Sequence, residues 1–488
     1  MRFTIIFKAE VIAAFILSLC LLIALTGPFA RTGDPGVGWH LRTGELVVKG
    51  VIPSTDPFLI GGEEREWISN QWLADAFLWS ARQYGGWEML DYLVVLIGGL
   101  AIVLTLMRLS STVLSVLAIS IGLPVLLALG SVQWIVRPVI FSFLGFSLLL
   151  ILCHYRAMGR ITSPQYLGGV AVLFAIWANV HPGFMLGFVP LAGMVLASFW
   201  APHREDLRTA LGALLLAGIA TCINPYGYEL HRSALGLVGD PFFMQLNSEW
   251  RPAEFRRFPY IVLPCAIGLL LITPEALRNR PVFERFTVCV LLILSLTARR
   301  YISFLVITLI PVVLIALHEW VRRLLAGSTL RALTCDQELH PRLALKCWGW
   351  LAALFVFGGC ISYQVRTVDE PGLDEHFPKA AVDFLAPSIE SKRIFHTPDW
   401  GGYLTWKFFP ERVATIDDRN ELNGKAAYER YLHIARTMPG WRTMLEEGSY
   451  THILTAPDTT LAGALEGDAG WIEVFRDAKA VVFEARGL

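Results

Sequence analysis

Long apolar stretches, separated by short polar segments, dominate the chain up to about residue 365. A helix needs about 20 mostly apolar residues to cross the roughly 30 Å of hydrocarbon in a bilayer, and this criterion predicts about eleven spans. The first is expected to be an uncleaved helix, because no clean small-residue cleavage site follows it. The expected spans are Val11–Phe29, Trp87–Met107, Thr112–Gly130, Val139–Cys153, Tyr166–Val180, Phe184–Trp200, Thr209–Ile223, Pro259–Ile272, Phe283–Leu296, Ile302–Leu317 and Trp348–Tyr363.

A long polar segment, residues 31–86, separates the first two expected spans. Apolar residues recur at helical spacing in two parts of it, which predicts short amphipathic helices at Val37–Lys49 and Gln71–Tyr84. Tryptophans in the second stretch favour a helix that lies along the membrane surface, although they also suit plain packing onto neighbouring helices.

The pattern changes after Asp369, where charged residues return and short β-like runs alternate with helical ones. Such alternation predicts a small α/β domain. The expected fold is therefore an all-α polytopic membrane bundle over residues 1–365, with 31–86 as its first external loop, followed by an α/β domain over 366–488. The expected strands are Arg393–Thr397, Val413–Ile416, His452–Thr455, Trp471–Phe475 and Ala480–Glu484, and the expected helices are Phe377–Leu385 and Ala426–Glu446.

Composition supports the membrane interpretation and excludes several functions. The 488 residues are 55% hydrophobic and 17% charged, whereas soluble domains have about 45–50% apolar and about 25% charged residues. The formal net charge of zero argues against a basic nucleic-acid footprint. Neither a dinucleotide nor a P-loop fingerprint occurs after a predicted strand, so nucleotide binding has no support. None of the eight cysteines lies in 31–86 or after 366, which argues against a disulfide framework.

Lys and Arg residues in the short loops predict the orientation. With the N-terminus inside, alternate loops carry the basic residues on the inner side, and residues 31–86 and the α/β domain lie outside. The functional face is then extracytoplasmic. The inner basic residues are Arg2, Lys8, Arg108, Arg156, Arg160, Arg204, Arg208, Arg278, Arg280, Arg285, Arg322 and Arg323.

Three arginines, Arg137, Arg299 and Arg300, lie on the predicted outer side against this trend. A guanidinium binds phosphate through a fork of donors, so these residues are candidate phosphate ligands; snorkelling or a salt bridge to an external acid is the alternative. Asp34 directly follows the first span and precedes Pro35. It is either a catalytic carboxylate at the bilayer edge or a helix-terminal turn residue.

Other polar residues recur at the predicted outer ends of helices. His40 and Arg42 follow Asp34, His181 ends the string W-A-N-V-H, and Glu249 precedes Trp250. Each is either a helix cap or packing residue, or part of one shared substrate cavity. Their recurrence on one face favours the cavity.

Several strings resemble the GT-C superfamily of integral-membrane glycosyltransferases, and within it an uncharacterised bacterial group. They are D-P-G-V-G-W-H-L-R-T-G-E and I-P-S-T-D-P-F between Asp34 and Phe58, W-A-N-V-H, N-P-Y-G, E-W, A-R-R and W-G-G-Y-L. Because these strings are spread from the first loop to the α/β domain, the resemblance extends over most of the chain. The resemblance implies a polyprenyl-phosphate-linked sugar donor and identifies Asp34 as the catalytic acid. It departs at Pro35, where many members have a second acid, and at Ser131–Pro138, which lacks the acidic metal ligands of oligosaccharyltransferases.

The chemistry that the resemblance implies needs one base, because the phosphate leaves as a stable anion. Asp34 supplies that base, the arginines compensate charge on the phosphate, and the anomeric carbon is inverted. We therefore expect an extracytoplasmic glycosyltransferase of the bacterial inner membrane that contacts membrane lipids and an undefined glycan, lipid or protein acceptor. The sequence gives no support for a divalent metal cofactor. The alternatives are a flippase or transporter of a lipid-linked anion and a catalytically inactive GT-C-like assembly subunit.

Overall fold

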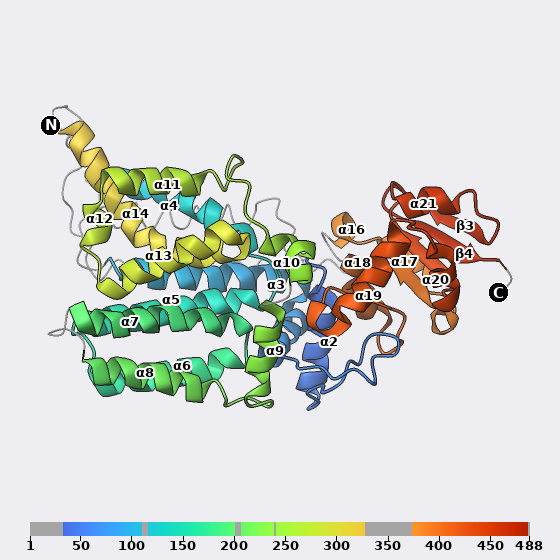
Figure 1. The fold of residues 1–488 in the computed structure, drawn as a ribbon, viewed down its shortest axis with the longest axis horizontal. Coiled ribbons are helices and arrows are strands. Elements are labelled where there is room, and N and C mark those ends of the chain that lie inside the picture. Colours follow the sequence, from blue (N-terminus) through green and yellow to red (C-terminus); the bar gives the residue numbers. More distant parts are fainter. Residues whose placement is uncertain (1–32, 110–115, 201–205, 239–240, 327–372, 487–488) are drawn as a thin grey trace.

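The computed structural model describes residues 33–109, 116–200, 206–238, 241–326 and 373–486. Within them, the chain forms a bundle of long helices with a small α/β unit at one end (Figure 1). The expected spans Val11–Phe29 and Trp348–Tyr363, and the expected domain boundary near residue 365, lie outside the described residues.

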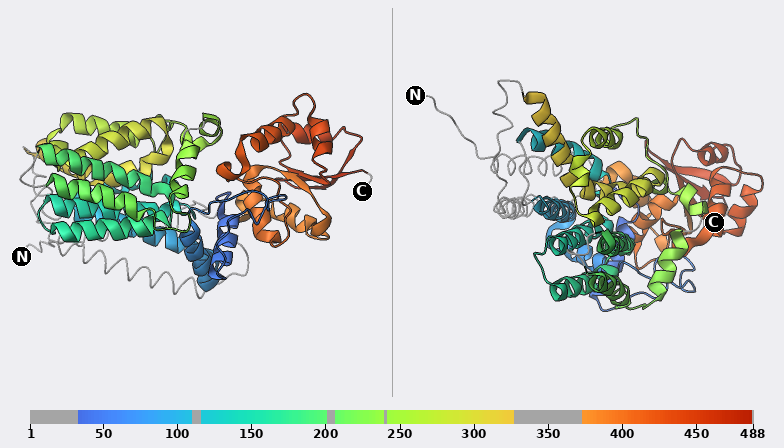
Figure 2. Two further views of the ribbon diagram at one scale, coloured as in Figure 1. Left: turned by 60° about the horizontal axis from the view of Figure 1, so that its bottom comes forward. Right: turned by 60° about the vertical axis from the view of Figure 1, so that its left-hand side comes forward.

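The bundle helices follow the other expected apolar segments, and they lie side by side along the long axis of the molecule (Figures 1 and 2). They are α3 (Trp72–Met107), α4 (Val116–Gly130), α5 (Val139–Ala157), α6 (Ser163–Ala178), α7 (Phe188–Trp200), α8 (Leu207–Ala220), α11 (Val262–Ile272), α13 (Val282–Thr297) and α14 (Ile302–Leu325). Among the neighbours, α3 packs on α5, α4 on α14, α6 on α8, and α7 on α13.

Four helical segments in the described part of the chain are long and apolar enough to cross a membrane: Trp72–Met107, Val139–Ala157, Pro182–Trp200 and Arg299–Leu325. Shorter apolar helices accompany them. Large apolar side chains such as Leu215 and Ile293 are exposed on the outer helices, as expected where lipid replaces water as the solvent. This is the pattern of a multi-pass membrane protein.

The second expected amphipathic helix and the next span form one element, α3, with a kink between them. Gly85 and Gly86 have non-helical backbone angles, and Gly86 has φ of +75°, which a residue with a Cβ rarely adopts. The kink directs the two halves of α3 differently, so the half before Gly85 packs along α2 (Val37–Val48) at the end of the bundle near the α/β unit.

Short elements complete the two ends of the bundle. The helices α2, α9 (Glu229–Val238) and α10 (Pro241–Leu246) lie at the end nearest the α/β unit, and α12 (Glu275–Arg278) lies at the other end (Figure 1). Four 3₁₀ turns connect the longer helices: η1 (Ser131–Gln133), η2 (Pro182–Gly187), η3 (Ser248–Trp250) and η4 (Arg299–Tyr301).

The α/β unit contains a four-stranded sheet in the order β1-β2-β4-β3. Strands β1 and β2 are parallel, and the other pairs are antiparallel. The strands are β1 (Ile394–His396), β2 (His452–Thr455), β3 (Trp471–Arg476) and β4 (Val481–Ala485). The helical elements are α16 (Leu373–His376), α17 (Lys379–Leu385), η6 (Ile389–Ser391), α18 (Pro398–Phe408), α19 (Asn420–Ala435), α20 (Trp441–Glu447) and α21 (Thr460–Leu465).

Two expectations for this unit are wrong in detail. The expected strand Val413–Ile416 joins no sheet, and its only ladder contact within the described residues is an isolated bridge between Ala414 and Leu59 of the first loop. The single helix expected over Ala426–Glu446 is two helices, because Pro439 interrupts it and Gly440 adopts φ of +89°.

Helix α18, which contains the W-G-G-Y string, packs directly on α2. The approach depends on glycine: a Cβ on Gly38 would lie 1.9 Å from the carbonyl oxygen of Gly402, and a Cβ on Gly402 would lie 2.2 Å from that of Pro35. Arg42 extends the contact, because its Nε and Nη2 donate to the carbonyl oxygen of Trp406. The crossing brings the segment after α18 beside the start of α2.

Candidate functional site

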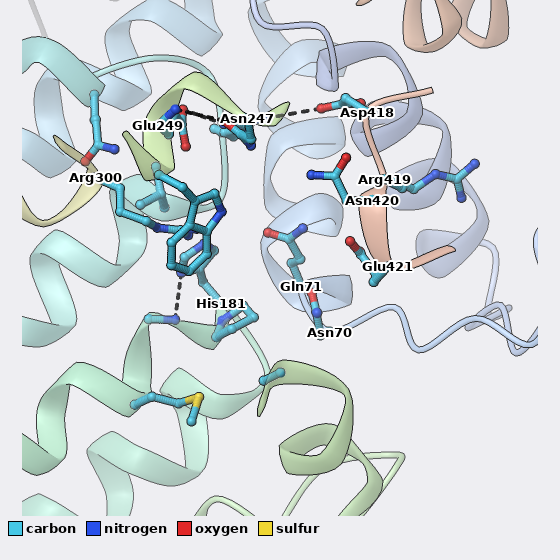
Figure 3. Close-up of a pocket in the computed structure, with 18 of the residues that line it drawn as sticks. Asn70, Gln71, His181, Asn247, Glu249, Arg300, Asp418, Arg419, Asn420 and Glu421 are labelled. Carbon is cyan, nitrogen blue, oxygen red and sulfur yellow. Dashed lines mark hydrogen bonds and ion pairs between the residues drawn. The ribbon is translucent and has the colours of Figure 1, made fainter. Parts of the chain in front are cut away.

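A cavity of about 340 Å³ lies between the bundle and the α/β unit. One wall carries His181, Glu249 and Arg300 from the loops at the bundle end, and the facing wall carries Gln71 and residues 418–421 of the α/β unit (Figure 3). The cavity therefore requires both parts of the chain. Its other polar and aromatic lining residues include Trp39, His40, Asn70, Gln133, Arg137, Asn247, Trp250 and Tyr301.

Arg137 is the centre of the charged network in this cavity. It stands between η1 and α5, and each of its three guanidinium nitrogens has a carboxylate partner. Nε lies 3.1 Å from Oδ2 of Asp34, Nη1 lies 2.9 Å from Oε1 of Glu249, and Nη2 lies 3.2 Å from Oδ2 of Asp418. The three acids come from three distant segments and converge on one cation, which raises the pKa of Arg137 even though burial acts to lower it.

Asp34 is the most enclosed of these acids. Its side chain is 3% exposed, against 16% for Asp418, and its Oδ1 accepts the backbone N–H of Gly36. Burial raises the pKa of Asp34 to about 7; Arg137 opposes the shift, and the negative charges of Asp418 and Glu249 reinforce it. Asp34 is not among the residues that line the cavity, whereas its ion-pair partner Arg137 is.

Asp418 brings a carboxylate of the α/β unit into the cavity wall. Its Oδ1 accepts the indole N–H of Trp39 at 2.8 Å, and its Oδ2 faces Arg137. A Cβ on Gly36 would lie 3.0 Å from Asp418 Oδ2 and 3.1 Å from Asp34 Oδ1, so the two acids flank this glycine. Burial raises the pKa of Asp418.

A buried clamp holds the segment that carries Asp418. Arg419 donates from Nε and Nη2 to Asp417 Oδ2, and Nη2 also lies 3.0 Å from Oδ1 of Asp56 in the first loop. The guanidinium lies over the rings of Trp39, Phe58 and Trp67 at 4.6–5.4 Å, and it points away from His181 and Arg300 (Figure 3). The clamp ties the α/β unit to the first loop next to the cavity.

Glu249 and Arg300 form the opposite wall. The guanidinium carbon of Arg300 lies 4.1 Å from the ring centre of Trp250, and no carboxylate among the described residues lies within ion-pair distance of it. Burial acts to raise the pKa of Glu249, but the guanidinium groups of Arg137, Arg300 and Arg299 outweigh it and hold that pKa below its ordinary value. Arg300 is thus a cavity cation without an acidic partner in this part of the chain.

His181 presents a neutral imidazole. Its Nδ1 accepts the backbone N–H of Gly183 at 2.9 Å and lies 2.8 Å from the hydroxyl of Ser142, which itself accepts the indole N–H of Trp177. Burial, followed by the charges of Arg300 and Arg137, lowers the pKa of His181 to about 3. The ring proton therefore belongs on Nε2, which leaves a neutral donor for a ligand.

Six of the eight expected site residues lie at the cavity, and two do not. Asp34, Arg137 and Glu249 form one ion-pair network, and His40, His181 and Arg300 line the same cavity. His40 is also held by Asp75, at 2.7 Å from Nδ1 to Oδ1, and burial holds its pKa well below the ordinary value.

Arg42 and Arg299 are not brought into the cavity. Arg42 binds Trp406 and Glu45 instead, because residues two apart on a helix point in different directions and His40 already faces the cavity. Arg299 donates from Nη2 to the hydroxyl of Ser248 at 2.7 Å.

Sequence reasoning missed Asp418 and the Arg419 clamp, which includes Asp56 of the first loop. One signal was present: the charged string Asp417-Asp418-Arg419 directly follows a short apolar run. Within the described ranges, no group of three His, Cys, Asp or Glu residues is arranged to hold a metal ion.

No protein-family model matches this chain, and no curated protein matches it. Several solved structures match the fold of this chain. The archaeal oligosaccharyltransferase AglB from Archaeoglobus fulgidus, in complex with an inhibitory peptide and a dolichol-phosphate, superposes with a TM-score of 0.57 at 11% identity, covering 98% of this chain and 74% of that one. ArnT from Cupriavidus metallidurans, bound to undecaprenyl phosphate, superposes with a TM-score of 0.50 at 14% identity, covering 97% of each chain. The chain therefore shares the fold of these two proteins over nearly its full length.

Proposed function

We propose that this protein is a GT-C-type glycosyltransferase that moves a sugar from a polyprenyl-phosphate-linked donor to an acceptor outside the bacterial inner membrane. One observation carries the proposal: three acids converge on Arg137 at the wall of a cavity that also contains Arg300, a cation without an acidic partner among the described residues. The structural neighbours were solved with dolichol-phosphate and undecaprenyl phosphate. A cavity with one available cation suits such a ligand.

In the proposed reaction, the donor phosphate binds Arg300 and accepts from Nε2–H of His181. The acceptor oxygen or nitrogen attacks the anomeric carbon while Asp34 takes the acceptor proton. The bond from the anomeric carbon to the phosphate oxygen breaks, and its electron pair leaves on the phosphate. Attack opposite the leaving group inverts the anomeric configuration, and Arg300 and Arg137 compensate the developing negative charge.

Arg137 links the two halves of this reaction. It now pairs with Asp34, and a donor phosphate competes with the three acids for its guanidinium. We propose that donor binding draws Arg137 off Asp34 and so exposes the base only when the donor is present. Asp418 already lines the cavity, and it is therefore the second candidate for the base; separate substitution of the two acids distinguishes them.

The proposed orientation places the cavity and the α/β unit outside. A reporter fused after Val368 should then be read as external, and one fused after Gly327 as cytoplasmic. The reverse result would place the cavity on the cytoplasmic face and remove the basis for an extracytoplasmic donor.

The activity is tested with full-length protein in lipid nanodiscs, an undecaprenyl phosphate donor that carries a radiolabelled hexose, and bacterial membranes as the source of acceptors. We expect free undecaprenyl phosphate to accumulate as label enters the acceptor fraction. In sealed vesicles, movement of intact donor between leaflets without cleavage would favour a flippase. Donor binding with neither result would favour an inactive assembly subunit.

A further inference from the structure

His40 and Asp75 form a buried pair where α2 packs along the first half of α3. Nδ1 of His40 lies 2.7 Å from Oδ1 of Asp75, and the two side chains are 2% and 0% exposed. Gly44, one turn after His40, makes this approach possible, because a Cβ there would lie 2.0 Å from the carbonyl oxygen of Asp75. The packing of the two helices therefore fixes the pair in place.

The Asp75 carboxyl group differs from the other buried acids in its partners. The buried acids among the described residues are Asp34, Asp56, Asp75, Glu284 and Asp417. Each of the other four forms an ion pair with an arginine. Asp75 contacts only His40, and its buried Oδ2 has no hydrogen-bond partner in this part of the chain. An uncompensated carboxylate is far more costly to bury than a neutral carboxyl group, so burial favours the protonated form of Asp75.

A protonated Asp75 determines which nitrogen of His40 carries the ring proton. The carboxyl hydroxyl donates to Nδ1, so the proton of the neutral ring belongs on Nε2. Nε2 has no hydrogen-bond partner among the described residues. His40 lines the cavity and Asp75 does not, so the ring edge away from Asp75 is the one available to a ligand. Burial, followed by the charge of Arg137, holds the pKa of His40 well below its ordinary value, which keeps the ring neutral.

We infer that Asp75 is a protonated positioning residue, which holds His40 as a neutral N–H donor toward the phosphate of the lipid-linked donor. The identity of this ligand rests on the proposed function, whereas the tautomer of His40 is a property of the protein alone. Together with Nε2–H of His181, His40 gives the cavity two uncharged donors in addition to Arg300. Unlike an imidazolium, a neutral ring binds a phosphate oxygen without forming an ion pair with the acids around Arg137.

The tautomer is measured by solid-state NMR on full-length protein in lipid nanodiscs, with isotopically labelled histidine, at neutral pH and without added ligand. Nδ1 is bonded to Cγ and Nε2 to Cδ2, so carbon–nitrogen correlations show which ring nitrogen is protonated. The His40 signals are those that disappear in His40→Gln and shift in Asp75→Asn, and either variant identifies them. We expect a protonated Nε2 and an unprotonated Nδ1. A proton on Nδ1, or on both nitrogens, would overturn the inference and leave the proposed function standing.

Two substitutions of Asp75 distinguish a protonated acid from an ionised one. Asp75→Leu removes the donor to Nδ1, and we expect undecaprenyl phosphate to bind about tenfold more weakly, the loss of one hydrogen bond to a charged group. Asp75→Asn should restore most of that binding, because its amide N–H donates to Nδ1 as the protonated acid does. If Asp75 were ionised, the same amide would reverse the tautomer and lower turnover by up to about 10⁴-fold. A loss in Asp75→Asn as large as in Asp75→Leu, at an unchanged melting temperature, contradicts the inference.

A double variant tests whether Asp75 acts through His40. His40→Ala should lose the same tenfold in lipid binding, and adding Asp75→Leu should cost nothing more, whereas additive losses would show that Asp75 acts independently. Asp383→Asn, an exposed acid of the α/β unit, is the control and should bind as the wild type does. A wild type that has the Nε2–H tautomer but binds no undecaprenyl phosphate would overturn the proposed function and the phosphate role of His40, and it would leave the protonated Asp75 standing.

Discussion

Two of the buried charged clusters in the described part of the chain lie at opposite ends of the bundle, and they are built in opposite ways. The site cluster has three acids, Asp34, Glu249 and Asp418, on one arginine. The other cluster lies at the end that includes α12 (Figure 1) and has one acid, Glu284. The Glu284 carboxylate accepts hydrogen bonds from Nε and Nη2 of Arg280 and lies 2.9 Å from Nδ1 of His154. The excess of acids around Arg137 suits a cluster that accepts a proton. The excess of basic groups around Glu284 suits a cluster that holds helices together.

The second cluster connects helices that are distant in sequence. Arg280 also donates to the carbonyl oxygen of Arg108, and Arg108 Nη2 donates to the carbonyl oxygens of Ile307 and Thr308. The Ile307 carbonyl is free for this bond because Pro311, four residues later, has no N–H. None of these residues lines the cavity, and we therefore assign the cluster to stability.

Removal of Glu284 should have the largest effect. Glu284→Ala leaves buried Arg280 without its carboxylate and should cost about 3–5 kcal/mol of stability, because breaking one side of a buried pair leaves an uncompensated charge. The readout is the fraction of protein that stays monodisperse after heating. Glu275→Ala removes an exposed partner of Arg323 and should change little. Equal heat resistance of the two variants would refute the structural assignment.

Weakening the Arg419 clamp should have an intermediate effect on turnover. Arg419→Lys keeps the charge but loses the two bonds to Asp417, so Asp418 shifts in the cavity wall. We expect turnover to fall by about ten- to a hundredfold, the range for a small misplacement of a site group, while undecaprenyl phosphate still binds. Parallel loss of binding and turnover, together with a lower melting temperature, would indicate that Arg419 only maintains the fold.

The pH dependence should show the smallest effect, and it sharpens the contrast between the clusters. Asp34 accepts a proton only when ionised, so turnover should rise with pH through about 7. Asp418→Asn removes a negative charge that raises the pKa of Asp34, and the rise should therefore move to lower pH. A rise that moves to higher pH in this variant, or turnover that does not change between pH 5 and 9, would contradict Asp34 as the titrating base.

Apolar run length predicted the described bundle helices well, because spanning a bilayer imposes a minimum length on each segment. The sequence also predicted Asp34, Arg137, His181, Glu249 and Arg300 as site candidates from their places at predicted helix ends. It did not predict that Arg137 binds three acids, since those contacts join segments that only the fold brings together.

Two inner-loop arginines show another limit. Arg108 and Arg280 were expected as loop residues that set orientation, but they are buried and bound to neighbouring helices. A count of charges along the sequence does not distinguish a solvated arginine from a buried one. Inside the bundle, Arg108 donates to the carbonyl oxygen of Ile307, and Arg280 pairs with the buried carboxylate of Glu284.

The central claim is that Asp34 accepts the proton during transfer, and release of undecaprenyl phosphate from a labelled hexose donor tests it directly. Asp34→Asn, Asp418→Asn and the exposed control Asp383→Asn are compared with the wild type, with lipid binding measured on the same samples. We predict that Asp34→Asn loses about 10²–10⁴-fold in rate while it still binds lipid, a typical loss for a general base. Asp418→Asn should lose less, and Asp383→Asn should match the wild type. Near-normal release by Asp34→Asn with loss in Asp418→Asn would contradict the claim and identify Asp418 as the base.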